Sequence, residues 1–256
     1  MINIDIVHET LGHGLAGTLL LWAGLLLTPA VQAQDWSLYD ALLAQHVVPV
    51  EREGITFHAV DYAAWAQDPR YAQLLQQIEN QPLESLQERA DQLAFYINVY
   101  NVYAIRMVID NTPLNSIRDA GSLFSPVWKK SVGTLGGRTV TLDEIEHQIL
   151  RPMGEPRIHF AIVCASLSCP DLRVEAFTAA RLEAQLQEQT QSFLDNASKG
   201  LRVDGARVRV SQIFDWFEED FDSAGGVEAF VRRYRALPAD IRLRADIPYN
   251  WNLNAQ

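Results

Sequence analysis

The sequence predicts an α+β fold, a single mixed domain with helices packed on a small, mainly antiparallel sheet that contains two hairpins. Helix-like and hairpin-like stretches are segregated along the chain and do not alternate strictly, which favours α+β over a doubly wound sheet. Residues 34–256 contain no internal repeat and no linker rich in serine or glycine. One domain is therefore the simplest organisation.

Helices are predicted where apolar residues recur at helical spacing or where a local start signal is present. The expected helical ranges are 36–47, 71–78, 87–110, 141–150, 178–197 and 227–235. The range 141–150 begins with a capping box, in which the side chains of Thr141 and Glu144 satisfy each other's backbone amides. Because such a box needs only four residues, it fixes the start of that helix locally.

Two hairpins and two further strands are expected. Residues 131–141 turn at Gly136-Gly137, and residues 201–210 turn at Asp204-Gly205, both strong short-range hairpin signals. Alternating apolar residues at 55–59 indicate a short strand. Residues 158–164 are almost all apolar and are bounded by prolines, so we interpret them as a buried central strand.

The first 33 residues resemble a secretory signal peptide. Residues 11–27 form a short apolar run, and Val31-Gln32-Ala33 supplies the small residues of a cleavage site, so Gln34 is the expected mature start. Residues 1–10 contain no lysine or arginine. An uncleaved N-terminal anchor and a buried helix therefore remain alternatives. If the leader is cleaved, we expect the protein in the periplasm or outside the cell. If it is not cleaved, we expect the leader to be the part of the chain that contacts the membrane.

The charge balance narrows the classes of partner. The chain carries a formal charge of −11, and nucleic acids and anionic membranes both require a basic face. The sequence therefore argues against a nucleic-acid partner and against an anionic membrane as partner, and it leaves an unidentified small molecule or protein. It predicts no cofactor.

Two asparagines interrupt the most apolar stretch of the chain. Asn98 and Asn101 lie within residues 93–105 and, being three residues apart, share one face of the expected helix. A buried amide without partners costs about 1–3 kcal/mol, so each must meet another polar group. Both can tie loops to the core, or both can belong to a functional site.

Glu146 and His147 form the next candidate pair. Glu146 flanks the apolar stripe of the 141–150 helix, and His147 follows at its edge. A pair of solvated side chains is the plain interpretation. The alternative is a carboxylate and an imidazole that face one cavity, as acid–base catalysis requires.

The segment from His159 to Pro170 contains both cysteines of the chain, Cys164 and Cys169. A disulfide is one interpretation, because an oxidising compartment closes nearby pairs. A catalytic thiol is the second, with Cys169 preferred because Pro170 suits the first position of a helix and a helix N-terminus lowers a thiol pKa. A metal bound by both cysteines and a histidine is the third, although the spacing matches no standard zinc pattern.

The polar residues near the cysteines are expected to converge where the 158–164 strand ends, since buried polar groups satisfy one another. The candidate catalytic residues are Cys169, His159, Glu146, Asn98 and Asn101. The candidate binding residues are His147, Cys164, Ser166 and Ser168.

Together, five motifs resemble domain of unknown function 547, a family of exported bacterial proteins that also occurs at the C-terminal end of some plant proteins. They are residues 60–62, 96–101, 143–147, 159–170 and 249–254. The resemblance extends from about residue 36 to residue 254. Two positions depart from it, since Tyr96 stands where tryptophan is frequent and Asn250 where aspartate is common. The resemblance supports the domain boundaries and the site but implies no established reaction.

Two functional hypotheses follow. The favoured one is a binding or scaffold module in which a Cys164–Cys169 disulfide trims the loop. The alternative is a thiol-dependent hydrolase or acyltransferase in which Cys169 is the nucleophile, His159 the base, and Asn98, Asn101 and Glu146 orient the reacting groups. The state of the two thiols separates them.

Overall fold

The computed structural model describes residues 35–122, 124–205 and 207–256. The predicted signal peptide at 1–33 and the expected mature start at Gln34 lie outside the described residues. Within the described ranges, no helix combines the length and apolar character that a membrane crossing requires.

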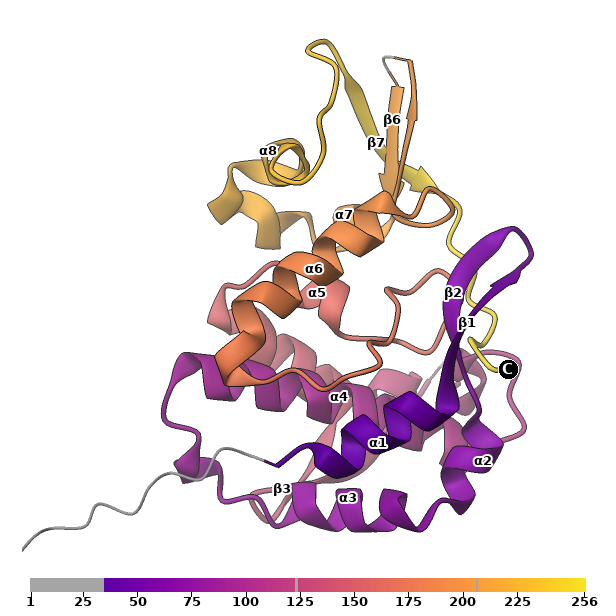
Figure 1. Ribbon diagram of the computed structural model, residues 1–256, viewed down its shortest axis with the longest axis vertical. Coiled ribbons are helices and arrows are strands. Elements are labelled where there is room, and N and C mark those ends of the chain that lie inside the picture. Colours follow the sequence, from indigo (N-terminus) through magenta and orange to yellow (C-terminus); the bar gives the residue numbers. More distant parts are fainter. Residues whose placement is uncertain (1–34, 123, 206) are drawn as a thin grey trace, which may run out of the picture. The chain divides into compact units, whose positions relative to one another are not determined.

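Helices dominate the first half of the described chain (Figure 1). They are α1 (Ser37–His46), α2 (Tyr62–Gln67), α3 (Pro69–Glu79) and α4 (Arg89–Asn111). Three of these agree with the predicted ranges 36–47, 71–78 and 87–110, whereas α2 was not predicted. Asp61 caps α2 by accepting a hydrogen bond from the Ala64 amide, so an unrecognised capping residue explains the omission.

Helix α4 runs through the centre of the larger core. Fourteen of its side chains are buried, and they come from every side of the helix. This is what the nearly uninterrupted apolar sequence predicts, because a helix without a polar face must be enclosed by other elements. The elements that enclose α4 provide one wall of the site described below.

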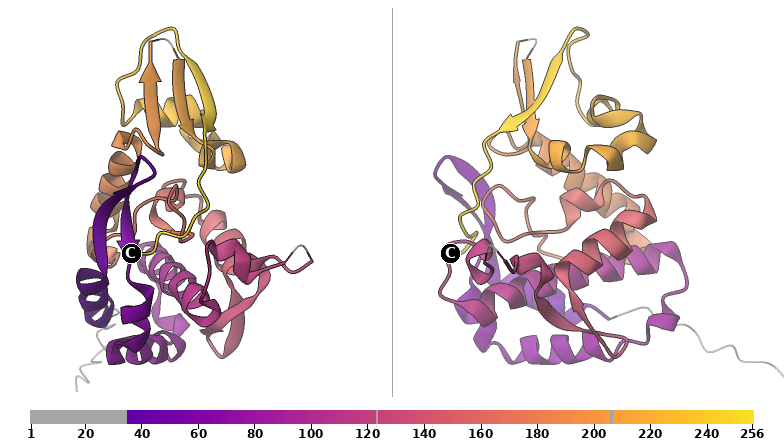
Figure 2. Two further views of the ribbon diagram at one scale, coloured as in Figure 1. Left: turned by 90° about the vertical axis from the view of Figure 1, so that its right-hand side faces the viewer. Right: turned by 180° about the vertical axis from the view of Figure 1, so that it is seen from behind.

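The strands form three small sheets, which confirms the mixed α+β class. They are β1 (Val47–Arg52) with β2 (Ile55–Val60), β3 (Ser131–Leu135) with β4 (Arg138–Thr141), and β5 (Leu201–Asp204) with β6 (Arg207–Ser211) and β7 (Arg242–Ile247). Both predicted hairpins are confirmed. Strand β1 adds a third, and β7 pairs with β6 in parallel (Figure 2).

The second half begins with the predicted capping box. The Thr141 amide donates to Glu144 and the Glu144 amide donates to the Thr141 hydroxyl, at 2.9 and 3.1 Å. The following turns are a π-helix, η4 (Glu144–Leu150). The remaining helices are α5 (Ile158–Ala161), α6 (Leu182–Asp195), α7 (Ile213–Trp216) and α8 (Gly226–Arg232). Short 3-10 turns are η1 (Leu83–Ser85), η2 (Ile117–Ala120), η3 (Val127–Lys129), η5 (Arg151–Met153), η6 (Ala179–Arg181) and η7 (Glu218–Ala224).

The predicted central strand at 158–164 is wrong. Residues 158–161 form the short helix α5, and the Ile162 amide donates to the Ile158 carbonyl at 2.9 Å, so its backbone is satisfied locally and not by a strand ladder. An apolar run of seven residues fits a buried helical turn as well as a strand, and periodicity cannot separate the two. The helix expected to begin at Pro170 is also wrong, because residues 170–177 have no helical turn.

Two large clusters of buried apolar side chains make up most of the interior. The first surrounds α4 and includes residues of α1, α2, α3 and η4. The second includes residues of α6, α7 and α8 and the inner face of the β5–β6–β7 sheet. Tyr100 and Cys169 belong to the first cluster and Ile213 to the second, and all three line one cavity. The site therefore lies where the two clusters meet.

Candidate functional site

The cavity between the two clusters has a volume of about 270 Å³. Its aromatic lining consists of Tyr100, Trp128, Trp216, Phe217, Tyr249 and Trp251. Its titratable lining consists of Asp143, Glu146, His147, His159, Cys164 and Cys169. An apolar concave site with a few convergent polar groups is the usual form of a small-molecule site.

The two cysteines are in direct contact in this cavity. Their Sγ atoms lie 2.6 Å apart, farther than the bond of about 2.05 Å in a disulfide, and both cysteines are free. Cys169 is buried with 4% of its surface exposed, whereas Cys164 is partly exposed. Both cysteines line the cavity, and Cys164 is the more exposed of the two.

The surroundings of Cys164 favour its thiolate. Burial opposes ionisation, but hydrogen bonds from Cys169, Ser166 and Tyr249 outweigh it and lower the pKa of the Cys164 thiol. The Ser166 and Tyr249 hydroxyl oxygens each lie 3.2 Å from the Cys164 sulfur. Burial, and the negative charge that develops on Cys164, raise the pKa of the Cys169 thiol well above its usual value. The pair thus divides into a nucleophilic thiol and a protonated one.

The C-terminal segment fixes the loop between the cysteines. The Leu167 amide donates to the Asn252 carbonyl at 2.9 Å, and the Asn254 amide donates to the Ala165 carbonyl at 3.0 Å. Ala165 itself has a φ of 58°, in the left-handed region, which costs a residue other than glycine about 1–2 kcal/mol. The pairing with residues 252 and 254 holds this strained residue directly beside Cys164, and strain of this kind gathers at functional sites.

Glu146 contributes an ionisable carboxyl group to the same cavity. It projects from the π-helix η4, an irregularity that is frequent at functional sites. The Tyr100 hydroxyl donates to Glu146 at 3.1 Å. Burial raises the pKa of Glu146 to about 7, against the opposing effect of the Tyr100 hydrogen bond. At neutral pH this side chain can therefore both give and take a proton.

His159 is engaged with Asp220 and makes no hydrogen bond to either thiol. Its Nε2 lies 2.6 Å from the Asp220 carboxylate, which also accepts two hydrogen bonds from Arg151, and its ring stacks on Phe217 at 4.0 Å. Burial lowers the pKa of His159, and the hydrogen bonds from His159 and Arg151 hold the pKa of Asp220 below its usual range despite burial. His159 therefore forms part of the cavity wall.

His147 lies at the rim of the cavity. It is exposed, and its Nδ1 lies 3.0 Å from the Arg151 guanidinium, so Arg151 joins it to the Asp220 carboxylate. Burial lowers the pKa of His147. Glu146 and His147 line one cavity but point to different partners.

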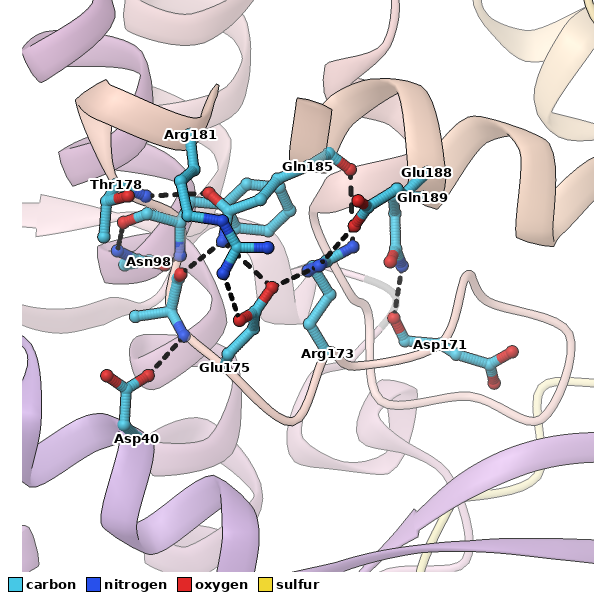
Figure 3. A network of polar contacts seen from close by, with 12 residues as sticks. Asp40, Asn98, Asp171, Arg173, Glu175, Thr178, Arg181, Gln185, Glu188 and Gln189 are labelled. Atoms are coloured by element: carbon cyan, nitrogen blue, oxygen red, sulfur yellow. Dashed lines mark hydrogen bonds and ion pairs between the residues drawn. The ribbon is translucent and has the colours of Figure 1, made fainter. Parts of the chain in front are cut away.

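Asn98 is satisfied by backbone and does not line the cavity. Its amide donates to the Phe177 carbonyl at 2.8 Å and its oxygen accepts from the Phe177 amide at 2.9 Å. Figure 3 shows Asn98 at the edge of a network that joins Asp40, Glu175 and Gln185 around the segment before α6. The side chain ties that segment to α4.

Asn101 makes the equivalent connection one turn later. Its amide donates to the Ala161 carbonyl at 3.0 Å, and its oxygen accepts from the Val163 amide at 2.8 Å. Asn101 therefore fixes the backbone immediately before Cys164 without lining the cavity itself. Ser168 also serves the backbone, because its hydroxyl accepts from the Asn250 amide at 2.9 Å.

The structure removes the argument that favoured Cys169 as nucleophile. No helix begins at Pro170, and Cys169 is the buried, protonated member of the pair. Cys164 is the more exposed residue and its thiol has the lowered pKa. Within the described part of the chain, no three side chains of histidine, cysteine, aspartate or glutamate are grouped so that they could hold a metal ion.

Several lining residues were not selected from the sequence. They are Tyr100, Trp128, Trp216, Phe217, Tyr249 and Trp251. Aromatic residues are normally interpreted as core, so no local chemical signal marked them, although Tyr100 lies in the family motif 96–101 and Tyr249 and Trp251 lie in the motif 249–254. Tyr249 and Cys164 are 85 positions apart, and only the fold brings them into contact.

Comparison with known proteins identifies the central part of the chain. Residues 83–194 match the DUF547 family, described as a protein of unknown function. The match includes α4, Glu146 and both cysteines, whereas Trp216, Tyr249 and Trp251 lie beyond it. The resemblance inferred from the sequence is thus confirmed for 83–194. No curated protein and no solved structure matches the chain.

Proposed function

We propose that the cavity is the active site of an enzyme that exchanges thiols and disulfides, with Cys164 as the attacking thiol and Cys169 as the resolving thiol. The contact between the two sulfur atoms carries this proposal. One thiol belongs to a partly exposed residue and has a lowered pKa, and the other lies 2.6 Å away, on a buried residue, with a raised pKa. This asymmetry matches the two roles that disulfide exchange requires.

The reaction proceeds in two balanced steps. The Cys164 thiolate attacks one sulfur of a substrate disulfide, the substrate S–S bond breaks, and the first substrate thiolate leaves. Cys169 then loses its proton and attacks the Cys164 sulfur, which releases the second substrate thiolate and leaves a Cys164–Cys169 disulfide. The substrate gains two electrons and the cysteine pair loses two. Two further thiol groups reduce the pair again and leave as a disulfide, and the sequence can run in reverse.

Glu146 supports the proton transfers in this scheme. A carboxyl group with a pKa of about 7 is protonated in a large fraction of molecules at neutral pH, so it can give a proton to a leaving thiolate in the cavity. The ionised form can take a proton back. Glu146 and Cys164 line the same cavity, and the negative charge of Cys164 adds to the effect of burial in raising the pKa of Glu146.

The favoured sequence hypothesis, a bridged Cys164–Cys169 pair, becomes one redox state of this enzyme. Acyl transfer by Cys164 is a second candidate, because six aromatic rings line the cavity beside a single activated thiol and suit an apolar acyl group. In that reaction Cys169 does not attack, so its removal leaves turnover intact.

We also propose that the protein is exported, on the strength of the leader at 1–33.

A single-turnover experiment separates these functions. Reduced protein is mixed with 2-hydroxyethyl disulfide, and released thiol and intact protein mass are followed together. The parent protein should release two thiols and lose two hydrogens as the bridge forms. The Cys169→Ser variant should release one thiol and keep one substrate half attached to Cys164. The Cys164→Ser variant should release none at a comparable rate.

Ser168→Ala is the matched control, because this hydroxyl contacts the Asn250 amide and not the thiols. It should react as the parent does. Disulfide exchange would be excluded if the parent released no thiol while the Cys169→Ser variant still turned over an activated ester; that result would assign acyl transfer to Cys164.

A further inference from the structure

One face of the β5–β6–β7 sheet carries an array of arginines. Arg207 and Arg209 of β6 lie beside Arg242 and Arg244 of β7 in register, and Arg202 of β5 lies opposite Arg209. The three strands lie side by side at one end of the described domain (Figure 2). Neighbouring strands are about 4.8 Å apart and alternate residues about 6.6 Å apart, so the five guanidinium groups project from a small area.

The array faces solvent because the opposite face of the sheet is buried. Val208 and Val210 of β6 are fully buried in the second core cluster, and Leu243 of β7 packs against the same cluster. Side chains alternate between the two faces of a strand, so the arginines on either side of these residues point away from the core. Arg202, Arg207, Arg242 and Arg244 are accordingly exposed. We call these four residues and Arg209 the arginine face.

The charges on this face are poorly compensated within the described chain. The register places Arg209 between Arg202 and Arg244, and like charges directly opposite each other destabilise a sheet. Arg207 lies between Arg242 and Asp204, so Asp204 offsets part of its charge. Arg209 pairs with Asp246 at 2.6 Å, and it is the one member of the arginine face with an ion pair among the residues described. A bound anion would relieve the repulsion that the bare sheet retains.

The negative net charge of the whole chain does not reveal the local positive charge of the arginine face. A formal charge of −11 argued against an anionic membrane partner, but at physiological salt charges act over a Debye length of only about 8 Å. A charged surface that approaches the sheet therefore interacts mainly with the five arginines and with Asp204 and Asp246 nearby. The acidic residues in the rest of the chain act on it more weakly.

We propose that the arginine face binds the phosphate groups of an anionic phospholipid surface. The array extends in two dimensions across three strands, as the phosphates of a headgroup layer do. It carries no aromatic side chain on which the bases of a single-stranded nucleic acid would stack. It also lacks the apolar centre of a stable protein–protein interface. Arginine suits this partner because its planar guanidinium binds phosphate through two hydrogen bonds.

Vesicle sedimentation tests this proposal on the full chain. Vesicles of phosphatidylcholine alone report any binding through the apolar residues 11–27, and vesicles that also contain phosphatidylglycerol report the added effect of charge. Each arginine near an anionic surface strengthens binding about fivefold. The Arg242→Gln/Arg244→Gln double variant should therefore bind phosphatidylglycerol vesicles about 25-fold more weakly, and raised salt should weaken the parent similarly.

Two further variants make the result specific. Arg242→Lys/Arg244→Lys keeps the charge and should retain most binding. Arg138→Gln/Arg181→Gln removes the same charge from exposed arginines elsewhere and should leave binding unchanged. Equal binding to both kinds of vesicle, or an equal loss in the Arg138/Arg181 control, would overturn the proposal. Tighter binding to soluble single-stranded DNA than to anionic vesicles would overturn it as well.

Discussion

Removal of the Tyr249 hydroxyl tests how the fold activates Cys164. In the folded protein this hydroxyl lies 3.2 Å from the Cys164 sulfur and reaches it from a segment 85 positions away. Tyr249→Phe removes one hydroxyl and keeps the ring, which packs on Trp216 and Trp251 at 4.8 and 4.6 Å between centroids. The substitution therefore changes the thiolate's hydrogen bonding and leaves the cavity wall in place.

The expected rise in the pKa of Cys164 follows from the loss of one hydrogen-bond donor to the thiolate. Such a hydrogen bond contributes about 1.5–3 kcal/mol, and one pKa unit corresponds to about 1.4 kcal/mol. The pKa of Cys164 should thus rise by about 1–2 units. Ser166 lies 3.2 Å from both the Tyr249 oxygen and the Cys164 sulfur, so its freed hydroxyl can compensate in part. We therefore expect a rise of about 1 unit in Tyr249→Phe and a larger one in Ser166→Ala/Tyr249→Phe.

The assay is the rate of Cys164 alkylation by iodoacetamide as a function of pH, with the modified cysteine identified by peptide mass. The midpoint of the rate profile reports the pKa of Cys164. Tyr103→Phe is the matched control, because its hydroxyl donates to the Thr134 carbonyl at 2.9 Å and does not contact the thiols. An unchanged midpoint in Tyr249→Phe, or an equal shift in Tyr103→Phe, would refute the hydrogen-bond explanation.

Three further predictions follow from the structure and the sequence. Asn98→Ala leaves the Phe177 amide and carbonyl unpaired, so urea unfolding should show a loss of roughly 2–4 kcal/mol with unchanged Cys164 alkylation; an unchanged urea midpoint would contradict the tie between α4 and that segment. Because burial raises the pKa of Glu146 to about 7 from 4.5, its contribution to stability is complete below about pH 4.5 and is lost as pH rises through 7. Between about pH 5 and 8 the free energy of unfolding should therefore decrease less steeply with pH in Glu146→Gln than in the parent protein. Urea unfolding at a series of pH values measures this, and an equal dependence on pH in both proteins would contradict the contribution of Glu146. The exported protein should begin at Gln34 by N-terminal sequencing, whereas a full-length chain in the membrane would identify the leader as an anchor.

Local signals predicted the elements whose hydrogen bonds are local. The Gly136-Gly137 turn predicted the β3–β4 hairpin, since both glycines adopt a positive φ that other residues resist. The capping box at Thr141 predicted where the next helical segment begins, and the apolar sequence of α4 predicted that it is enclosed. Each of these features is decided within a few residues, so the sequence by itself determined them.

The tertiary structure decided the elements whose partners are remote. The apolar residues 158–164 fit a strand or a helical turn equally well, and their surroundings chose the helical turn α5. Strand β7 was not predicted, although its residues alternate between polar and apolar as a strand requires. Its parallel pairing with β6, which is remote in the sequence, was decided by the tertiary structure. Strand β1 escaped prediction because Pro49 interrupts it, which is tolerated at a sheet edge.

In the candidate site, too, the sequence determined some features and the tertiary structure decided the others. The sequence marked Glu146, Cys164 and Cys169 as the residues able to do chemistry, and all three line one cavity. It could not tell which thiol is activated, because that depends on the hydroxyl of Tyr249 and on unequal burial. Residue types determine which reactions are possible, whereas the pKa of each group depends on neighbours that only folding brings together.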